Sequence, residues 1–215
     1  MKKVDFSPKK DRFANIPKTI EKLKNGPELR IVMLGDSIIN DTASSQYELL
    51  LMRKYPKCKV TKIRSVRGST GCWYYAKENR VQEWVLNHKP DLLIIGGVSN
   101  RDDADSVRSV VQQVKKANPA IEIMLVTPVF GNPAYKYNAS WTYEIDAEKY
   151  PFRAQMRDIA KEEKCAFFDM TAEWKKYVNE SGCDVGWFMR DAVHANARGS
   201  QILGRLLEIW FDVAK

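Results

Sequence analysis

Short apolar runs alternate along this chain with segments of helical periodicity, and this alternation restricts the possible folds more than any other feature. Leu92 to Ile95 is continuously apolar, as expected of a strand that is buried on both faces of a sheet. Strands that alternate with helices predict an α/β protein with a parallel sheet covered on both faces. We expect five strands, at residues 30–34, 60–66, 92–95, 121–127 and 165–168.

The segments between these runs are predicted to be amphipathic helices, because their apolar residues recur every three or four positions. The first of these helices ends at Gly26-Pro27, and the last carries a wide apolar face near the carboxyl end of the chain. The predicted helices cover residues 13–25, 47–54, 81–86, 107–114, 152–163 and 202–210.

A chain of 215 residues suits one domain with a short appendage. Residues 1–12 are polar and rich in lysine, so we expect them to form a loosely ordered arm. We therefore divide the chain into an N-terminal arm with a short helix, residues 1–28, and a main domain, residues 29–215. Because no apolar stretch reaches the roughly 20 residues of a membrane-spanning helix, we expect no membrane contact.

The charge balance permits polyanionic partners but carries no nucleic-acid signal. The chain has 35 lysine and arginine residues against 27 aspartate and glutamate residues, which gives a net charge of +8. The basic residues are scattered without a stripe or a nucleic-acid motif, so we interpret them as a solvated surface and expect no nucleic-acid partner. Met1-Lys2-Lys3 is not followed by an apolar core. Two locations stay open: the cytoplasm, or the periplasm or exterior if a signal or upstream domain was removed.

The cysteines indicate neither a metal site nor a disulfide framework. They lie far apart, without a CxxC pair and without histidine at zinc spacing. We expect buried free thiols, with a single disulfide as the alternative for an exported protein. The four cysteines are Cys58, Cys72, Cys165 and Cys183.

The stretch MLGDSIIND, residues 33–41, ends the first predicted strand with a glycine, an acid and a serine. Parallel α/β sheets place their binding sites beyond the carboxyl ends of the strands, which is where Ser37 falls. Gly35 would permit a close turn there. A serine hydroxyl is a weak nucleophile on its own, so catalysis at Ser37 would require a base within hydrogen-bond reach.

The chain offers two histidines as candidate bases. His88 lies at the opposite end of the next strand and is expected at the surface. His194 follows Asp191 by three residues, a spacing that would let the carboxylate hold the imidazole Nδ1–H and stabilise the imidazolium. The alternative is that Asp191 caps a following turn of helix.

Two further loops could supply donors for a developing oxyanion. RGSTGCW, after the second strand, offers the backbone N–H groups of Gly68 and Gly71, and IIGGVSN, after the third, offers the side-chain amide of Asn100. Each segment alone is typical of an ordinary turn. All of them are expected at the same edge of the sheet as Ser37, which favours a shared site.

In order along the chain, four short blocks resemble those of the SGNH (GDSL-type) hydrolases. They are Gly35-Asp36-Ser37, a glycine after the second strand, Gly97-x-x-Asn100 and Asp191-x-x-His194, and the resemblance covers residues 30–212. It implies a flavodoxin-like three-layer sandwich with a mostly parallel sheet of about five strands.

The resemblance also implies a role for each block. Ser37 would be the nucleophile and would donate its own N–H to the oxyanion hole, which Gly71 and Asn100 would complete. His194 would be the base, and Asp191 would orient it. The second block lacks the asparagine usual before its glycine, so Gly68 remains an alternative to Gly71. The third block reads GGVSN rather than GxND, and Asp36 is expected to support the turn.

A serine esterase that removes acetyl groups from carbohydrate, without metal or cofactor, is the function we expect from this set. A small-molecule or polysaccharide ester would be its partner. Aromatic residues could line a groove for sugar rings. They are mixed with polar residues, whereas a lipase-like enzyme would be expected to have a more continuous apolar lid. The alternatives are a lysophospholipase or thioesterase on the same scaffold, and a non-catalytic carbohydrate-binding module. The candidate substrate-binding residues are Trp73, Tyr74, Trp141 and Trp187.

Overall fold

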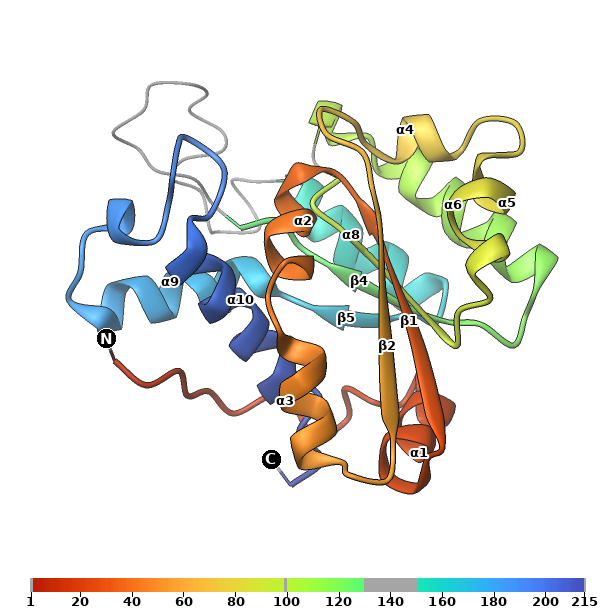
Figure 1. Ribbon diagram of the computed structural model, residues 1–215. Coiled ribbons are helices and arrows are strands. Elements are labelled where there is room, and N and C mark those ends of the chain that lie inside the picture. The colour runs from red at the N-terminus through yellow and green to blue at the C-terminus, as the bar shows by residue number, and fades with distance from the viewer. Residues whose placement is uncertain (1, 99, 130–150, 215) are drawn as a thin grey trace.

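A five-stranded parallel sheet with the strand order β2-β1-β3-β4-β5 forms the centre of the protein. The computed structural model describes residues 2–98, 100–129 and 151–214 (Figure 1). The predicted α/β class and the five parallel strands are confirmed. The strands are β1 (Glu28–Gly35), β2 (Lys59–Val66), β3 (Leu92–Gly96), β4 (Glu122–Val126) and β5 (Ala166–Phe168).

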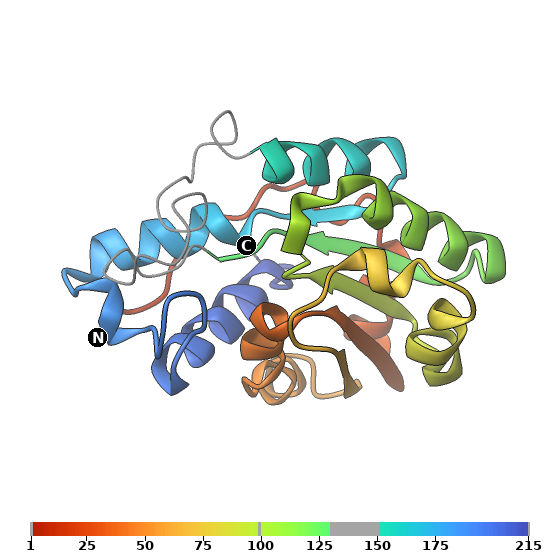
Figure 2. The same ribbon diagram turned by 90° about the horizontal axis from the view of Figure 1, so that it is seen from above.

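Helices cover both faces of the sheet (Figures 1 and 2). In β1 the side chains of Ile31 and Met33 face one hydrophobic core, whereas those of Val32 and Leu34 face the other. The first core lies under α1 (Pro17–Asn25), α2 (Ser37–Ala43), α3 (Tyr47–Lys54), α9 (Met170–Ser181) and α10 (Ala197–Trp210). The second core lies under α4 (Cys72–Tyr75), α5 (Arg80–Trp84), α6 (Ala104–Ala117) and α8 (Pro151–Glu162). The described residues also form three short 3₁₀ turns, η1 (Leu86–His88), η2 (Asn100–Asp102) and η3 (Val185–Trp187).

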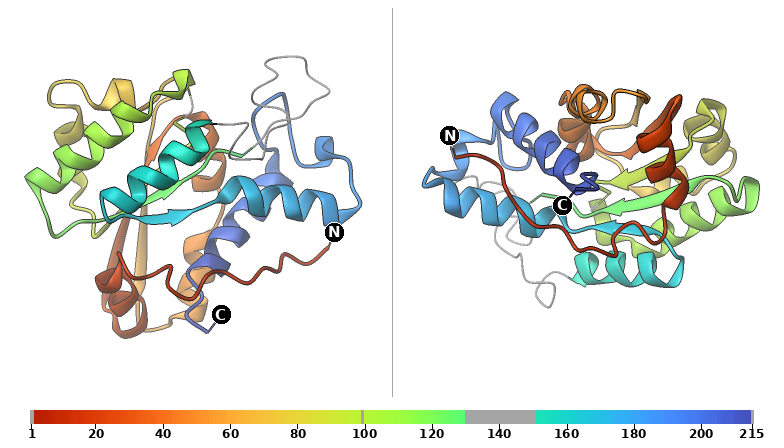
Figure 3. Two further views of the ribbon diagram at one scale, coloured as in Figure 1. Left: turned by 180° about the vertical axis from the view of Figure 1, so that it is seen from behind. Right: turned by 90° about the horizontal axis from the view of Figure 1, so that it is seen from below.

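The N-terminal arm is packed rather than loosely ordered, which corrects the expectation from its composition. Val4 and Phe6 are buried, and the ring of Phe6 stacks on that of Phe168 at 5.9 Å between centroids. Arg12 donates to the backbone oxygen of Trp210 at 2.7 Å, and the arm crosses the α9–α10 end of the molecule on its way to α1 (Figure 3). The arm and α1 therefore share a core with the main domain.

The helices differ from the expectation in two ways. Helix α1 begins at Pro17 rather than at residue 13, because proline favours the first helical position, and α10 begins at Ala197 rather than at residue 202. Helices α2, α4 and α9 were absent from the sequence-based expectation. Among the described helices, none is long and apolar enough to cross a membrane.

All four cysteines are free thiols, and three are buried as predicted, whereas Cys183 is half-buried.

A buried carboxylate of β4 caps the start of α1. Glu122 is 9 % exposed and accepts the backbone N–H groups of Lys18 at 2.9 Å and Thr19 at 2.7 Å. Ile16, which precedes the helix, supplies no side-chain cap. The first N–H groups of a helix have no partner within the helix, so Glu122 fixes α1 against the amino edge of the sheet.

Replacing Glu122 by alanine is expected to lower the free energy of unfolding by about 1–3 kcal/mol, because two buried N–H groups lose their acceptor. Glu122→Gln retains one acceptor oxygen and should lose less. Urea unfolding of both variants, with the exposed Glu78→Ala as a control, measures the effect. Equal stability of Glu122→Ala and the control would contradict the capping role.

Candidate active site

Ser37 is the first residue of α2, immediately beyond the carboxyl end of β1. The turn between them requires glycine at residue 35, whose φ is +154° and where an added Cβ would lie 1.9 Å from the backbone oxygen of Gly96. Asp36 then caps α2 by accepting the N–H of Ile38 at 2.8 Å. The predicted close turn is therefore present, and it places the serine at the edge where parallel strands form sites.

Ser37, His194 and Asp191 form one hydrogen-bonded chain. The His194 Nε2 atom lies 2.8 Å from Ser37 Oγ, and its Nδ1 atom lies 2.9 Å from each carboxylate oxygen of Asp191. Ser37 and His194 are 157 positions apart in the sequence, so the tertiary fold brings them together. The geometry suits proton transfer from the serine hydroxyl to the imidazole.

The alternative considered for Asp191, a cap of the following turn, also holds in part, because its carboxylate accepts the N–H groups of Val193 and His194, although no helix begins there. Asn196 caps α10 instead, by accepting the N–H groups of Arg198 and Gly199. Partial burial opposes ionisation of Asp191, yet the N–H groups of Val193 and His194 and the imidazole together hold the pKa of its carboxyl below the usual value. Asp191 is thus an ionised partner for His194 at neutral pH.

An ion pair between the buried Asp41 and the exposed Arg190, which sequence reasoning missed, joins α2 to the loop that carries the histidine. Asp41 is 3 % exposed and accepts from Arg190 Nη1 at 2.9 Å and from the N–H of Ala195 at 2.8 Å. Arg190 also donates to the backbone oxygen of Ala195 at 2.7 Å, and its Nε lies 3.8 Å from Asp191. Burial raises the pKa of Asp41, against the opposing effect of Arg190. The spacing of Ser37 and Asp41, one helical turn, is the only sequence signal for this contact.

Asp36 is directed into the protein and supports the turn, as expected. It is buried, and burial raises the pKa of its carboxyl to about 8, even though the N–H of Ile38 opposes the shift. Gly97, with φ of +69°, passes so close that an added Cβ would lie 2.3 Å from Asp36 Oδ1. Asp36 is therefore largely uncharged at pH 7, and its packing depends on glycine at residue 97.

The loops after β2 and β3 flank the serine. In the sheet register Gly35 pairs with Val66 on one side and with Gly96 on the other. The N–H of Arg67 donates to the oxygen of Gly35 at 3.0 Å, and so does the Tyr75 hydroxyl at 2.6 Å, which fixes the segment between them.

The candidate oxyanion donors occupy these two loops. Gly71 is buried and caps α4, whereas Gly68 lies in open space, and the structure does not decide between them. Asn100 begins η2 after β3, and its side chain lies outside the described part of the structure. All three backbones thus follow β2 or β3 at the sheet edge where β1 ends before Ser37.

Cationic side chains cover the aromatic residues that were predicted to bind substrate. Arg101 Cζ lies 4.2 Å from the ring centroid of Trp73, and Arg198 Cζ lies 4.9 Å from that of Trp187. Tyr74 lies against two guanidinium groups, those of Arg67 at 4.7 Å and Arg80 at 4.5 Å. Trp187 is 55 % exposed, whereas Trp73 and Tyr74 are half-buried. Trp141 lies outside the described residues.

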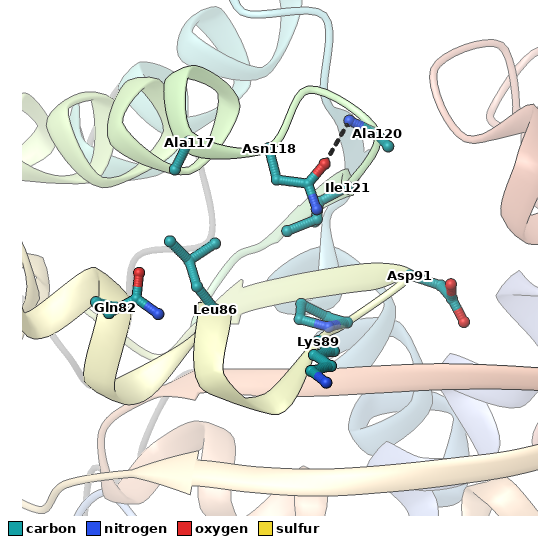
Figure 4. A pocket seen from close by; sticks show the side chains of 9 residues that line it. Gln82, Leu86, Lys89, Asp91, Ala117, Asn118, Ala120 and Ile121 are labelled. Atoms are coloured by element: carbon teal, nitrogen blue, oxygen red, sulfur yellow. Dashed lines mark hydrogen bonds between the residues drawn. The ribbon is translucent and has the colours of Figure 1, made fainter.

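Two other features lie at the opposite edge of the sheet. His88, in η1, is half-buried just before β3, far along the strand from Ser37. A cavity of about 470 Å³ lies at the amino ends of β3 and β4, between Leu86, Asn118 and Ile121 (Figure 4). Within the described ranges, no three His, Cys, Asp or Glu side chains are grouped to hold a metal ion.

Known proteins share this fold. The chain is similar to a two-domain esterase active on acetylated mannans, with a TM-score of 0.71 and 17 % identity, over 96 % of this chain but 56 % of that one. It is similar to an acetylxylan esterase from Geobacillus stearothermophilus, with a TM-score of 0.65 and 18 % identity, over 89 % of this chain and 98 % of that one. A lipase/acylhydrolase from Enterococcus faecalis gives a TM-score of 0.61 and 17 % identity, over 84 % of this chain and 93 % of that one.

A search of curated proteins found no matching sequence. The sequence profile of the GDSL-like lipase/acylhydrolase family, however, matches residues 33–202, which include Ser37, Asp191 and His194. This match spans most of the chain and agrees with the resemblance found in its four motifs. The chain therefore belongs to the GDSL-like lipase/acylhydrolase family, a family of serine ester hydrolases.

Proposed function

We propose that the protein hydrolyses acetyl esters on carbohydrate through an acyl-enzyme formed on Ser37. One observation carries this proposal: the Ser37 hydroxyl is 2.8 Å from His194 Nε2, while Asp191 holds the opposite nitrogen of the same ring. A serine that is hydrogen-bonded to an oriented imidazole has the activation that nucleophilic catalysis requires.

In the first half of the reaction, Ser37 Oγ attacks the ester carbonyl carbon and its proton passes to His194 Nε2. Asp191 stabilises the imidazolium that results. The carbonyl oxygen becomes an oxyanion, which accepts hydrogen bonds from the N–H of Ser37, from that of Gly71 or Gly68, and from Asn100. The carbon–oxygen bond to the sugar then breaks, and His194 returns the proton to the leaving hydroxyl. Acetyl-Ser37 remains.

Water completes the reaction by the same groups. His194 takes a proton from the water molecule, whose oxygen attacks the acetyl carbonyl carbon. The bond to Ser37 Oγ breaks, His194 returns the proton to the serine, and acetate leaves. The steps use side chains and backbone N–H groups of this chain together with one water molecule, and they need no cofactor.

Two considerations support a carbohydrate substrate. The similar solved structures include esterases for acetylated mannans and acetylxylan, although this chain spans only 56 % of the mannan esterase. The described rim of the site is polar and cationic, with Arg67, Arg101 and Arg198 at its aromatic residues. A lysophospholipase or thioesterase remains the second candidate, and a series of 4-nitrophenyl esters from acetate to palmitate separates them. Faster turnover of long chains would favour the second candidate.

Ser37→Ala is expected to reduce hydrolysis of 4-nitrophenyl acetate by at least about 10⁴-fold, because the nucleophile is lost. Its melting temperature should stay close to that of the wild type, since Ser37 is only half-buried. Turnover close to the wild-type rate in a folded Ser37→Ala protein would refute the acyl-enzyme, and a wild type without ester hydrolysis would favour a non-catalytic binding module.

Activity is expected to rise with pH through one limb, because the base must be a neutral imidazole. The lowered pKa of Asp191 keeps that carboxylate ionised at neutral pH, so it adds no second limb there. The pH dependence of kcat/KM measures this, and a flat profile with rate-limiting chemistry would contradict the role of His194.

The ion pair between Asp41 and Arg190 is expected to position His194 for Ser37. Asp41→Asn and Arg190→Gln should each lower kcat by about 10- to 100-fold, because small misplacements of a catalytic group are costly. KM should change little. The double variant should lose no more than the more damaged single variant, since both changes release the same loop. Additive losses in the double variant would show that the two residues act separately.

A further inference from the structure

Two tryptophan–arginine pairs belong to elements that lie on either side of α2, the helix that begins with Ser37. The pair of Trp73 and Arg101 joins α4 to η2, and the pair of Trp187 and Arg198 joins η3 to the start of α10. In Figures 1 and 2, α4 and the segment before α10 flank the start of α2, where the serine lies. The elements that carry the two pairs therefore lie on either side of the segment that begins with Ser37.

A third arginine lies beside the same site. The backbone N–H of Arg67 binds the oxygen of Gly35, two residues before the serine, and its guanidinium group lies against Tyr74. Arg67 and Arg101 thus approach α4 from the loops that follow β2 and β3, on either side of β1.

These cations are not neutralised by the protein, as far as the structure describes it. Arg67, Arg101 and Arg198 are exposed, and no carboxylate among the described residues forms an ion pair with any of them. Arg190 differs, because Asp41 and Asp191 both lie within 4 Å of its guanidinium group. The arginines at the aromatic residues therefore keep their charge available for a ligand.

A stacked guanidinium group suits an anion better than a neutral sugar. A guanidinium group that lies over an aromatic ring presents the N–H groups at its edge, which match a carboxylate or sulfate with two parallel hydrogen bonds. Arg198 donates one of these groups, Nη1, to the backbone oxygen of Trp187 at 3.5 Å and has its other N–H groups for a ligand. A sugar ring would stack on an uncovered aromatic face, and arginine lies over one face of Trp73 and one face of Trp187. Charge recognition is therefore the chemistry these pairs provide.

We propose that the substrate is an acylated acidic glycan, whose carboxylate or sulfate groups bind Arg101 and Arg198 while the ester lies at Ser37. This inference rests on the esterase function proposed above and adds the charge of the substrate to it. The net charge of +8 would also raise the rate of encounter with a polyanion.

Three acetylated polymers with one backbone test the proposal: dextran, carboxymethyl-dextran and dextran sulfate. The value of kcat/KM for each polymer is divided by that for 4-nitrophenyl acetate. The wild-type ratio should be at least about tenfold higher for a charged polymer, since charge-assisted hydrogen bonds are strong, and should fall as salt rises. The two charged polymers distinguish carboxylate from sulfate.

Arginine variants then assign the effect to the two pairs. Arg101→Gln and Arg198→Gln should each lower the charged-polymer ratio by about tenfold. Arg53→Gln is the matched control. Arg53 is exposed near the carboxyl end of α3, and the chain continues from there to the amino end of β2, which lies at the sheet edge opposite Ser37. The ratio of this variant should equal that of the wild type.

The outcomes separate the two proposals. Equal ratios for the three polymers, no turnover of any polymer, or the same ratio in Arg101→Gln, Arg198→Gln and Arg53→Gln would each overturn the acidic-glycan proposal. The esterase function would survive all three results as long as 4-nitrophenyl acetate is cleaved through Ser37. Absence of that cleavage in the wild type would instead refute the esterase function itself.

Discussion

The site depends on one buried carboxylate. Asp41 lies a single helical turn after Ser37 and binds both the side chain of Arg190 and the backbone of Ala195, the residue after His194. A buried charge is costly unless its hydrogen bonds are satisfied, and only the loop that carries the histidine satisfies these. Because Asp41 is buried and depends on these hydrogen bonds, it holds the loop of His194 at a fixed position relative to α2, the helix of Ser37. The hydrogen bonds of His194 to Ser37 and Asp191 then join two segments, α2 and the histidine loop, that the Asp41 contacts already hold together.

The strand positions could be predicted from the sequence for a physical reason. Strands follow from apolar runs, and the carboxyl ends of parallel strands meet at one edge, so the sequence suffices to place Ser37 and the glycine loops at that edge. Helix α2 was missed because its apolar positions continue the buried pattern of β1. The contact of Asp41 with Arg190 was missed because it depends on how a loop packs 149 residues away.

The arm and the aromatic residues show where composition misleads. Polar residues dominate the first part of the chain, yet single apolar side chains such as Phe6 suffice to fix it to the core. Trp73 and Trp187 could be found from the sequence, but their arginine partners could not. Arg101 and Trp73 belong to different loops, and only the sheet order brings these loops together. The chemical character of the site rim thus arises from tertiary structure.

The long separation between the serine and its base has a consequence for synthesis of the protein. The Ser37 turn, the sheet strands and α2 can all emerge from a ribosome before His194 exists, and α10, which packs against α2 and α3, emerges last. Domains are made from the amino end at a finite rate, and contacts of high sequence separation form late. A chain that has been synthesised only as far as β5 therefore has the Ser37 turn without His194. The arrangement of Ser37, His194 and Asp191 forms only after the segment that carries His194 has folded beside α2.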